Sequence, residues 1–515
     1  MSFETVGDLV ALGARRSPER VALKMRDGEG VTYLELDRRT DRLANALLGS
    51  GLAPGDRVGA WMEDRLEYCE LYLALAKAGL VVVPINARYR PGEAAYCLED
   101  SGARALVWTD GLSGLVEELG PDPSLLLLSI DGSGPAGTRA LGELEASGAE
   151  GRPSPPQPDV LLVLAYTSGT TGPPKGAMLT HRTVLSICRL NTMSYRLPAY
   201  SVAAITGTLS FPAMMPAHVL SHLYVGGTAI IMGRWDPEIL VDTIERERVT
   251  FTYLATPTMH AFSEYARGVP ERWMTLESVL HSSSRATPEQ RAELCDVIGD
   301  RYVEGWGMTE NSGGLMAATT RRDISSPPPG VDIHASAGRA VIEMAIDVID
   351  EDGRPLPHDG STLGELIYTG PAVTTGYWNR PDATAEALRA GWFHSGDLGS
   401  IDEQGYVYVT ERRTDLIVSG GMNVYPNEVE RCIMMLPGVH ECIVVGTPHE
   451  RWGQTVVAVI IGATDVTEAQ VIEHCRRELA SYKKPTRVLF VDDVPRTPSL
   501  KVKRAELREQ VAQFR

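Results

Sequence analysis

The sequence predicts an α/β fold: a large N-terminal domain of layered, largely parallel sheets and helices with a β-rich subdomain, followed by a small α+β C-terminal domain. Two observations lead to this prediction. Short apolar runs alternate with amphipathic helical patterns over most of the chain, which is typical of parallel sheets with connecting helices. From about residue 364 this alternation gives way to short strand patterns and turns. The length of 515 residues is enough for several domains of about 100–200 residues each.

The N-terminal third begins the alternation. The runs "RVGAWM" (57–62) and "LVVVPIN" (80–86) are expected strands, and "LEYCELYLALAKAG" (66–79) between them is an expected helix. The proline-rich stretch "GRPSPPQPD" (151–159) is the clearest linker, because proline fixes φ and removes a backbone donor.

Two helices in the middle of the chain have visible starting points. In "WDPEILVDTIERERV", Asp236 is the expected N-cap and Pro237 the first helical residue. In "ATPEQRAELCDVIG", Thr287 and Gln290 form a capping-box pattern. The run "TFTYLAT" between these helices is an expected strand, so the strand–helix alternation continues here.

The pattern changes in the last third of the chain. The segments "GELIYTG" and "GYVYVTE", with the turn "DEQG", predict a hairpin-rich subdomain. After "ERRTDLIVSGG" we expect two helices, "PNEVERCIMML" and "EAQVIEHCRRELA", and three strands, "ECIVVG", "TVVAVIIG" and "RVLFVDD". This stretch of about one hundred residues is long enough for a second, smaller domain.

Composition excludes several classes of function. The formal net charge of −18 disfavours nucleic acid or an anionic membrane as partner, since both require basic surfaces. Seven cysteines without a CxxC pair are typical of reduced thiols in a cytoplasmic protein, and no secretory signal is visible. The uncharged run from Leu197 to Gly233 is interrupted by prolines, glycines and histidines, so we expect buried core and pocket wall there, without stable membrane insertion.

The stretch "YTSGTTGPPKG" (166–176) directly follows the apolar run "DVLLVLA". A loop that leaves a buried strand offers backbone N–H groups to phosphate oxygens, and here several hydroxyls and Lys175 are added. Its spacing is not the GxxxxGK[ST] of a Walker A loop, so a P-loop NTPase is disfavoured. The segment by itself leaves two interpretations open, a phosphate cradle and a flexible polar loop.

Five motifs in order resemble those of the adenylate-forming superfamily, which includes acyl-CoA synthetases, peptide-synthetase adenylation domains and luciferases. They are "YTSGTTGPPKG", "GWGMTE" (305–310), "GWFHSGDLG" (391–399), "ERRTDLIVSGGMNVYPNEVE" (411–430) and "PRTPSLKVKRAELRE" (495–509). The resemblance covers nearly the whole chain. It implies a domain that binds AMP and the acid (1–411) and a mobile C-terminal domain (412–515), with a hinge at about 412–415.

The resemblance also implies the catalytic residues. Lys501 matches the family's catalytic lysine, which bridges carboxylate and α-phosphate oxygens; the alternative is an ordinary basic residue. Thr309 would donate to the α-phosphate. Glu310 would hold Mg²⁺, a hard cation that prefers carboxylate and phosphate oxygens. Fixed cations and donors suit a reaction in which charge develops on phosphoryl oxygens.

The nucleotide would be held by the other motif residues. Trp306, where relatives usually have Tyr, would stack on adenine, or else belong to the core. Asp397 and Arg412 would hold the ribose, with an exposed salt bridge as the alternative for each. The full set expected to bind ATP or CoA is Thr167, Ser168, Gly169, Thr170, Thr171, Gly172, Lys175, Trp306, Gly307, Met308, Thr309, Asp397, Arg412, Gly420, Gly421 and Lys501.

The acid pocket is less clearly marked. Phe211 falls where many relatives place the gate of the acid channel, although a core position is open too. Gly313, in the small and glycine-rich "SGGLM", would leave room for a chain or ring. His218 lies on the uncharged run, where a core histidine is the favoured interpretation. The residues expected to contact the acid are Phe211, His218, Ser282, Ser283, Arg285 and Gly313.

Three departures from the family pattern stand out. Relatives usually carry a Gly-Gly-Ala-Pro-like stretch beside adenine, where this chain has "HSSSRAT" (281–287); Arg285 there would face a polar part of the substrate or solvent. Thr414 stands where the hinge usually has Asp or Lys. Leu500 stands where Gly usually precedes the catalytic lysine, and Leu does not readily adopt φ > 0.

The resemblance predicts an ATP-dependent, AMP-forming acid–CoA ligase, with Gly420 and Gly421 lining the path of the CoA pantetheine arm. The expected partners are a fatty or aromatic acid, ATP and CoA, with a homodimer possible. The alternatives are transfer of the adenylate to an amine or a carrier protein, activation of nitrite by an ATP-dependent diazotase, and a non-catalytic nucleotide-binding protein.

Overall fold

The computed structural model of the chain describes residues 3–167, 173–211, 213–282, 286–412, 415–419, 422–449, 452–463, 466–479, 482–496 and 502–513. The chain divides into two compact units. The first comprises Met1–Thr167, Pro174–Ile346 and Tyr368–Phe393, and the second includes Asp347–Ile367 and His394–Arg515.

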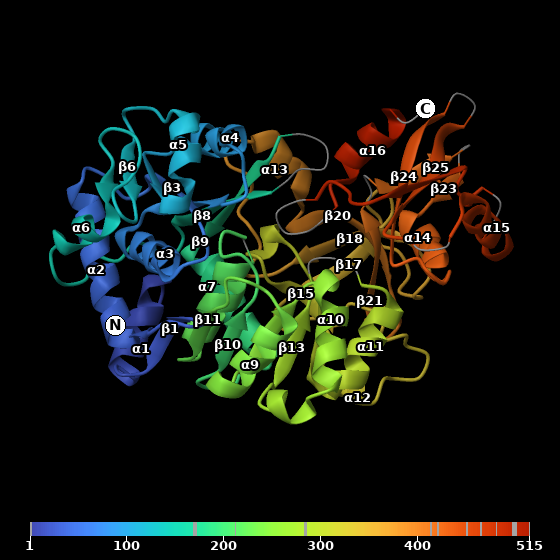
Figure 1. Ribbon diagram of the computed structural model, residues 1–515, viewed down its shortest axis with the longest axis horizontal. Coiled ribbons are helices and arrows are strands. Elements are labelled where there is room, and N and C mark those ends of the chain that lie inside the picture. The colour runs from blue at the N-terminus through green and yellow to red at the C-terminus, as the bar shows by residue number, and fades with distance from the viewer. Residues whose placement is uncertain are drawn as a thin grey trace. The chain divides into compact units, whose positions relative to one another are not determined.

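The first unit contains a nine-stranded sheet of order β16-β15-β14-β13-β12-β10-β11-β1-β2. The pairs from β1 through β11, β10, β12 and β13 to β14 are parallel, while β2, β15 and β16 pair antiparallel. Leu23 of β1 pairs with Ala229 of β11, so the first strand lies beside a much later one (Figure 1). The strands are β1 (Val21–Met25), β2 (Gly30–Thr32), β10 (Val202–Ile205), β11 (Thr228–Ile231), β12 (Phe251–Leu254), β13 (Ser278–His281), β14 (Tyr302–Gly307), β15 (Leu315–Ala318) and β16 (Arg339–Ala340).

A seven-stranded sheet in the same unit has the order β7-β6-β5-β3-β4-β8-β9. Every pair is parallel except the β8–β9 hairpin. Trp61 and Trp108 are fully buried in its core. The strands are β3 (Arg57–Met62), β4 (Val81–Asn86), β5 (Ala105–Trp108), β6 (Leu126–Ser129), β7 (Arg139–Ala140), β8 (Leu161–Thr167) and β9 (Lys175–Thr180).

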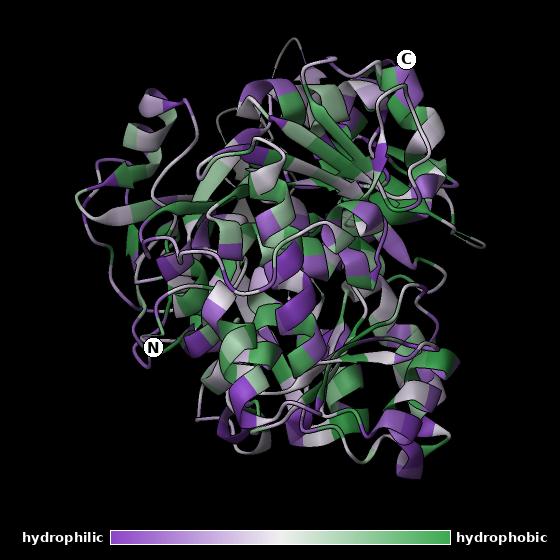
Figure 2. Cartoon of the chain, turned by 90° about the vertical axis from the view of Figure 1, so that its left-hand side faces the viewer, coloured by the Kyte–Doolittle hydropathy of each residue, from purple (hydrophilic) through white to green (hydrophobic). Residues whose placement is uncertain are grey.

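The helices of the first unit connect these strands. They are α1 (Gly7–Arg16), α2 (Tyr33–Gly49), α3 (Leu66–Ala78), α4 (Pro91–Ser101), α5 (Ser113–Leu119), α6 (Leu141–Ala146), α7 (His181–Ser194), α8 (Leu220–Tyr224), α9 (Pro237–Glu247), α10 (Thr256–Arg267), α11 (Pro288–Ile298), α12 (Arg321–Ser325) and α13 (Pro381–Ala387). Short helical turns are η1 (Asp110–Leu112), η3 (Pro270–Trp273), η4 (Gly299–Arg301), η5 (Thr309–Asn311) and the π-helix η2 (Met214–Val219). Figure 2 shows hydrophilic and hydrophobic residues on the same helices, as expected for layers that cover a sheet.

The two predicted helix starts are confirmed. The Asp236 carboxylate accepts hydrogen bonds from the backbone N–H groups of Glu238 and Ile239, at 3.0 and 3.1 Å. Thr287 and Gln290 form the reciprocal capping box at the start of α11. Each cap satisfies backbone donors that a helix start otherwise leaves without a partner.

The predicted linker 151–159 runs inside the first unit and is fastened to it. The Arg152 guanidinium donates to the Asp8 carboxylate at 2.7 Å, and the Asn45 amide donates to the carbonyl of Gly151 at 2.7 Å. It connects α6 to β8 and is therefore a connection within the first unit rather than a boundary between units.

The uncharged run from Leu197 to Gly233 forms β10, η2, α8 and β11 and is largely buried, as predicted. Among the helices that the structure describes, none has the length and apolar character needed to cross a membrane.

A third sheet confirms the hairpin-rich subdomain. Its order is β17-β18-β20-β19, and β21 pairs with β20 through the predicted "DEQG" turn, in which Gly405 N–H donates to the Asp402 carbonyl at 2.9 Å. The strands are β17 (Ala345–Ile349), β18 (Gly364–Thr369), β19 (Leu388–Arg389), β20 (Trp392–Ile401) and β21 (Val407–Arg412).

The C-terminal part of the second unit is the predicted α+β segment. Its sheet has the order β23-β22-β25-β24, and β26 pairs with β25. Alternate residues of β24 and β25 pack against helices α14 and α15 on one face and against α16 on the other. The elements are β22 (Ile417–Ser419), β23 (Met422–Val424), α14 (Pro426–Met434), β24 (Glu441–His449), β25 (Gly453–Ile461), α15 (Glu468–Glu478), β26 (Arg487–Val491) and α16 (Arg504–Gln513).

The α/β fold class is thus confirmed, with its largely parallel layers, β-rich subdomain and small α+β segment. The predicted domain boundary between residues 411 and 412 stays a prediction. The second compact unit already includes the chain from His394 onward.

Candidate active site

The β8–β9 hairpin carries both ends of the predicted phosphate loop. Thr167, the last residue of β8, lies opposite Lys175, the first residue of β9, and its hydroxyl donates to the Lys175 carbonyl at 3.4 Å. The buried strand predicted from "DVLLVLAYT" is therefore present. The expected phosphate ligands Ser168, Gly169, Thr170, Thr171 and Gly172 lie outside the described residues.

The "GWGMTE" motif lies at the carboxyl end of β14, where ligands of parallel sheets commonly bind. Trp306, Gly307 and Met308 lead into the turn η5, which contains Thr309 and Glu310. The Trp306 ring packs edge-on against Tyr368, with centroids 5.9 Å apart and 7% of the residue exposed. Its predicted stacking on adenine stays a prediction.

Glu310 is 6% exposed and held from two directions. The Tyr377 hydroxyl donates to Glu310 Oε1 at 2.8 Å, and the backbone N–H of Thr374 donates to the Glu310 carbonyl at 2.7 Å. The Lys175 ammonium lies 5.4 Å from the centroid of the same Tyr377 ring. The structure therefore brings together two predicted site residues that are 135 positions apart in the numbering.

Sequence reasoning missed Tyr377. The segment that carries it pairs with β9 through an antiparallel bridge between Ala177 and Tyr377. The N–H of Trp378 donates to the Gly176 carbonyl at 2.8 Å, which fixes the segment beside the hairpin. An aromatic residue after glycine in "GYWNRP" gave no indication of this partner, since the pairing is long-range.

The predicted ribose residues lie on two neighbouring strands of the third sheet. Asp397 of β20 lies directly opposite Arg412 of β21 in the antiparallel register. Asp397 is 7% exposed, and its N–H donates to the Ser395 hydroxyl at 3.0 Å. The two positions are therefore adjacent, and their predicted contact with a shared ribose stays a prediction.

Phe211 lies partly buried in the segment that follows β10. Asp64 anchors this segment, because its Oδ1 accepts from the Leu209 N–H at 2.6 Å and from the Thr208 hydroxyl at 2.9 Å. Burial raises the pKa of Asp64 above its ordinary value, and these hydrogen bonds only partly offset that effect. Asp64 is a second residue that the sequence did not indicate.

His218 belongs to the aromatic core. It is 2% exposed and stacks on Tyr195 with ring centroids 5.4 Å apart. It also packs against Phe251, and burial lowers the pKa of its imidazole to about 3. The favoured interpretation from the sequence, a core histidine, agrees with this environment, so His218 is not carried into the proposed acid site.

The remaining predicted acid contacts lie after β13 and η5. Ser282 is largely buried, and its carbonyl accepts from the Tyr253 hydroxyl at 3.3 Å, whereas Ser283 and Arg285 lie outside the described residues. Gly313 has φ +76 in the turn after η5, a conformation that favours glycine. At the neighbouring Gly314, a Cβ would lie 2.1 Å from Ile187, so that glycine permits close packing and leaves no open space.

A buried charged cluster supports the carboxyl ends of β13 and β14. Glu304 accepts from His281 Nδ1 at 2.7 Å and pairs with Arg291 at 3.1 Å. Burial acts to raise the pKa of Glu304, but Arg291 and His281 outweigh it, so the pKa is lowered. The cluster was not predicted, because its members come from three separate elements.

The C-terminal site residues Gly420, Gly421 and Lys501 lie outside the described part of the chain. Ser419 pairs with Met422 in the β22–β23 hairpin and with Gly453 of β25. Trp452, which directly precedes Gly453, stacks its ring on His449 with centroids 4.4 Å apart.

Comparison with known proteins gives concordant matches. The family model "AMP-binding enzyme" matches residues 11–378, and "AMP-binding enzyme C-terminal domain" matches residues 428–501. The chain is 35% identical over 513 residues to a feruloyl-CoA synthase of Amycolatopsis sp, covering 99% of this chain and 100% of that protein. It is 33% identical over 501 residues to the long-chain-fatty-acid–CoA ligase FadD13 of Mycobacterium tuberculosis, covering 93% of each. The crystal structure of ATP-bound MatB from Rhodopseudomonas palustris has a TM-score of 0.87 and 30% identity, covering 99% of both chains.

Proposed function

We propose a function from one premise that the matches establish: this chain belongs to the AMP-binding enzyme family, within the adenylate-forming superfamily. The proposed activity is that of an ATP-dependent, AMP-forming acid–CoA ligase. Both named relatives form thioesters of CoA according to their names, so transfer of the adenylate to an amine or a carrier protein, and activation of nitrite in place of a carboxylic acid, are not favoured. A non-catalytic nucleotide-binding protein is disfavoured too.

The observation that carries the proposal is the meeting of Lys175 and Glu310 at Tyr377. A lysine at the base of a glycine-rich hairpin and a buried carboxylate at the end of a parallel strand supply opposite charges near one point. A triphosphate with its bound cation needs both, since the lysine attracts phosphate oxygens and the carboxylate attracts the metal.

The Glu310 carboxylate suits a magnesium ion. Its Oε1 is occupied by the Tyr377 hydroxyl, and within the described ranges Oε2 has no hydrogen-bond or ion-pair partner. One carboxylate together with substrate phosphates is a common way for proteins to hold Mg²⁺. When bound, the ion would neutralise charge on the phosphates; Glu310 would hold it and Thr309 would donate to the α-phosphate.

The reaction proceeds in two balanced steps. A carboxylate oxygen of the acid attacks the α-phosphorus of ATP, forming an acyl–phosphate bond as the bond to the β-phosphate breaks and pyrophosphate leaves. The CoA sulfur then attacks the acyl carbon, the bond to AMP breaks, and the thiol proton passes to solvent. Lys501 would stabilise the charge that develops in the first step.

The second step assigns a role to the C-terminal segment 412–515. We propose that it turns about the hinge at 412–415 after adenylation and that Gly420 and Gly421 then line the pantetheine path, because glycine lets a ligand approach the backbone closely.

All seven cysteines are free thiols, which fits a reducing cytoplasmic setting. The proposed assembly is a monomer or a homodimer.

A panel of acids tests the function. Purified protein with ATP, Mg²⁺ and CoA is offered fatty, aromatic and dicarboxylic acids, and AMP, pyrophosphate and thioester are quantified. The proposal expects one class to give the three products in equal amounts. Turnover only with an amine, a carrier protein or nitrite would replace the CoA-ligase assignment, and no turnover with any substrate would remove it.

A further inference from the structure

One side chain, Tyr377, contacts both charged groups of the proposed ATP site. Its hydroxyl donates to Glu310 Oε1 at 2.8 Å, and its ring lies beneath the Lys175 ammonium at 5.4 Å from the centroid. The distance is within the range of a cation–π interaction, and the hydrogen bond has the length of a well-formed one to a carboxylate. Tyr377 belongs to none of the motifs that predicted the site.

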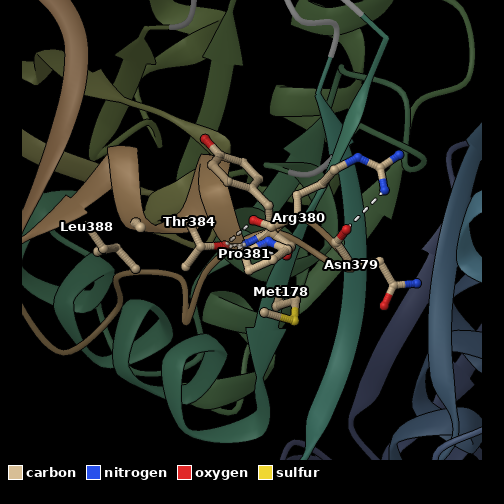
Figure 3. Close-up of a pocket in the computed structure, with 8 residues that line it drawn as sticks. Met178, Asn379, Arg380, Pro381, Thr384 and Leu388 are labelled. Carbon is tan, nitrogen blue, oxygen red and sulfur yellow. Dashed lines mark hydrogen bonds between the residues drawn. The ribbon is translucent and has the colours of Figure 1, made fainter.

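The backbone of Tyr377 is fixed independently of these two contacts. Its N–H donates to the Thr384 hydroxyl at 2.9 Å, and the Gly376 carbonyl accepts from the Met178 N–H at 2.9 Å. Thr384 and Met178 line a hollow of about 430 Å³ that Tyr377 also borders (Figure 3). The ring is therefore held from its backbone side by strand pairing and a side-chain hydrogen bond.

The geometry leaves Glu310 with one committed oxygen. A carboxylate whose Oε1 accepts from a fixed hydroxyl cannot rotate freely, so Oε2 keeps one direction. Restricting a ligand before the metal binds lowers the entropic cost of coordination. The same ring contacts Lys175, and Lys175 and Glu310, both within the described ranges, form no direct ion pair. A direct ion pair would neutralise both groups.

We propose that Tyr377 is a positioning residue that presents Glu310 Oε2 to the cation of the nucleotide and holds Lys175 beside it. This inference rests on the proposed function, in which Glu310 is the cation ligand. The hydroxyl would orient the carboxylate that binds the metal, and the ring would hold the lysine ammonium. Substitutions can therefore separate the two roles.

The test measures ATP binding by calorimetry with EDTA and with saturating Mg²⁺, which requires no turnover. The readout is the ratio of the two Kd values. Tyr377→Phe keeps the ring and removes the hydroxyl, so the magnesium enhancement should fall about tenfold, as for loss of one hydrogen bond to a charged group, while ATP affinity in EDTA stays within about twofold. Tyr377→Leu should weaken ATP binding in EDTA as well.

A matched control and a double variant complete the design. Tyr408→Phe removes another tyrosine–carboxylate hydrogen bond, the 3.0 Å bond to Asp402, and should leave the enhancement unchanged. In a Glu310→Ala background, Tyr377→Phe should have no further effect, because it acts through that carboxylate. Mn²⁺ bound with ATP, measured by electron paramagnetic resonance, provides a second readout that should weaken in Tyr377→Phe.

Two outcomes would overturn the inference in distinguishable ways. If Glu310→Ala abolishes the magnesium enhancement but Tyr377→Phe leaves it intact, Tyr377 does not position Glu310 and the proposed function stands. If Glu310→Ala itself leaves the enhancement intact, the metal assignment fails and the inference fails with it.

Discussion

Lys501 is the residue on which the first half-reaction should depend most. Lys501→Ala removes a positive charge that stabilises the transition state, so adenylation should slow by about 10²–10³-fold. Thioester formation from a pre-made acyl-adenylate should be largely spared, because in the proposed second step the segment 412–515 that carries Lys501 has turned away from the adenylate and CoA occupies its place. Rapid-quench measurement of each half-reaction separates the two. Equal losses in both would mean that Lys501 has a structural role.

Glu310 should control the magnesium requirement. Glu310→Gln keeps the shape of the side chain and the acceptor for Tyr377 but removes the charge, so more Mg²⁺ should be needed for half-maximal adenylation and the step should slow. Lys175→Ala should have a milder effect, since backbone N–H groups share the phosphates. Magnesium titration of pyrophosphate release provides the measurement, and an unchanged titration in Glu310→Gln would remove this residue from the metal site.

Three buried histidines predict acid sensitivity. Burial lowers the pKa to about 4 for His181, about 3 for His218 and about 4 for His222. Below about pH 6.5 the unfolded chain binds protons at these rings and the folded chain does not. Each histidine therefore lowers the free energy of unfolding by about 1.4 kcal/mol per pH unit, until the pH reaches the pKa of that histidine in the folded state. The midpoint of thermal unfolding should therefore fall between about pH 6.5 and 4.

The variant His218→Phe provides the control for this pH dependence. Phenylalanine keeps an aromatic ring against Tyr195 and Phe251 but does not titrate. The midpoint should depend less on pH in this variant than in the wild type. The same dependence in both would show that other groups cause the acid sensitivity.

Motifs indicated candidate site residues, and their roles stay predictions. The structure places Trp306 to Glu310 at the end of β14, and Asp397 and Arg412 at paired positions of β20 and β21. Tyr377 was missed because its partner is 67 residues away, and a hydrogen bond of that separation leaves no local pattern. The prediction was limited because the contact forms only when the chain folds, and not because the hydrogen bond is weak.

Individual elements were predictable where a local rule applies. The caps at Asp236 and Thr287 depend on neighbours within three residues, and both formed. The place of β1 beside β11 was not predictable, because parallel pairing joins distant segments without a turn between them. The proline-rich segment 151–159 was predicted as a linker from composition alone, which gave no sign of its fastening to Asp8.

The segment after β10 provides a prediction at the same scale. Asp64→Ala removes the acceptor of two hydrogen bonds, so the segment that carries Phe211 should loosen. The KM for the acid should rise at least about fivefold, which corresponds to the lower end of the roughly 1–3 kcal/mol expected for the loss of such hydrogen bonding. Asp64→Asn keeps Oδ1 as acceptor and should stay close to the wild type. Steady-state kinetics on the two variants gives the comparison; equal KM values would show that the anchor does not reach the acid site.

The whole molecule combines a large unit with Glu310 and Lys175 and a second unit whose sheet carries Asp397 and Arg412. The overall charge of −18 does not attract anionic substrates, so ATP and the acid must be captured by local cations and hydrogen-bond donors. Composition could predict neither the acid nor its acceptor, because both depend on pocket shape. The family match indicates the class of reaction. The most informative experiment is therefore the one that identifies the acceptor.

Acid-dependent AMP release with and without CoA tests the central claim most directly. Without CoA, the enzyme should release one equivalent of pyrophosphate and then stall with the acyl-adenylate bound and shielded from water. Adding CoA should restore continuous AMP release, with one thioester formed for each AMP. If CoA leaves the rate unchanged while an amine or a carrier protein restores turnover, the chain is an adenylating enzyme of another branch and not an acid–CoA ligase.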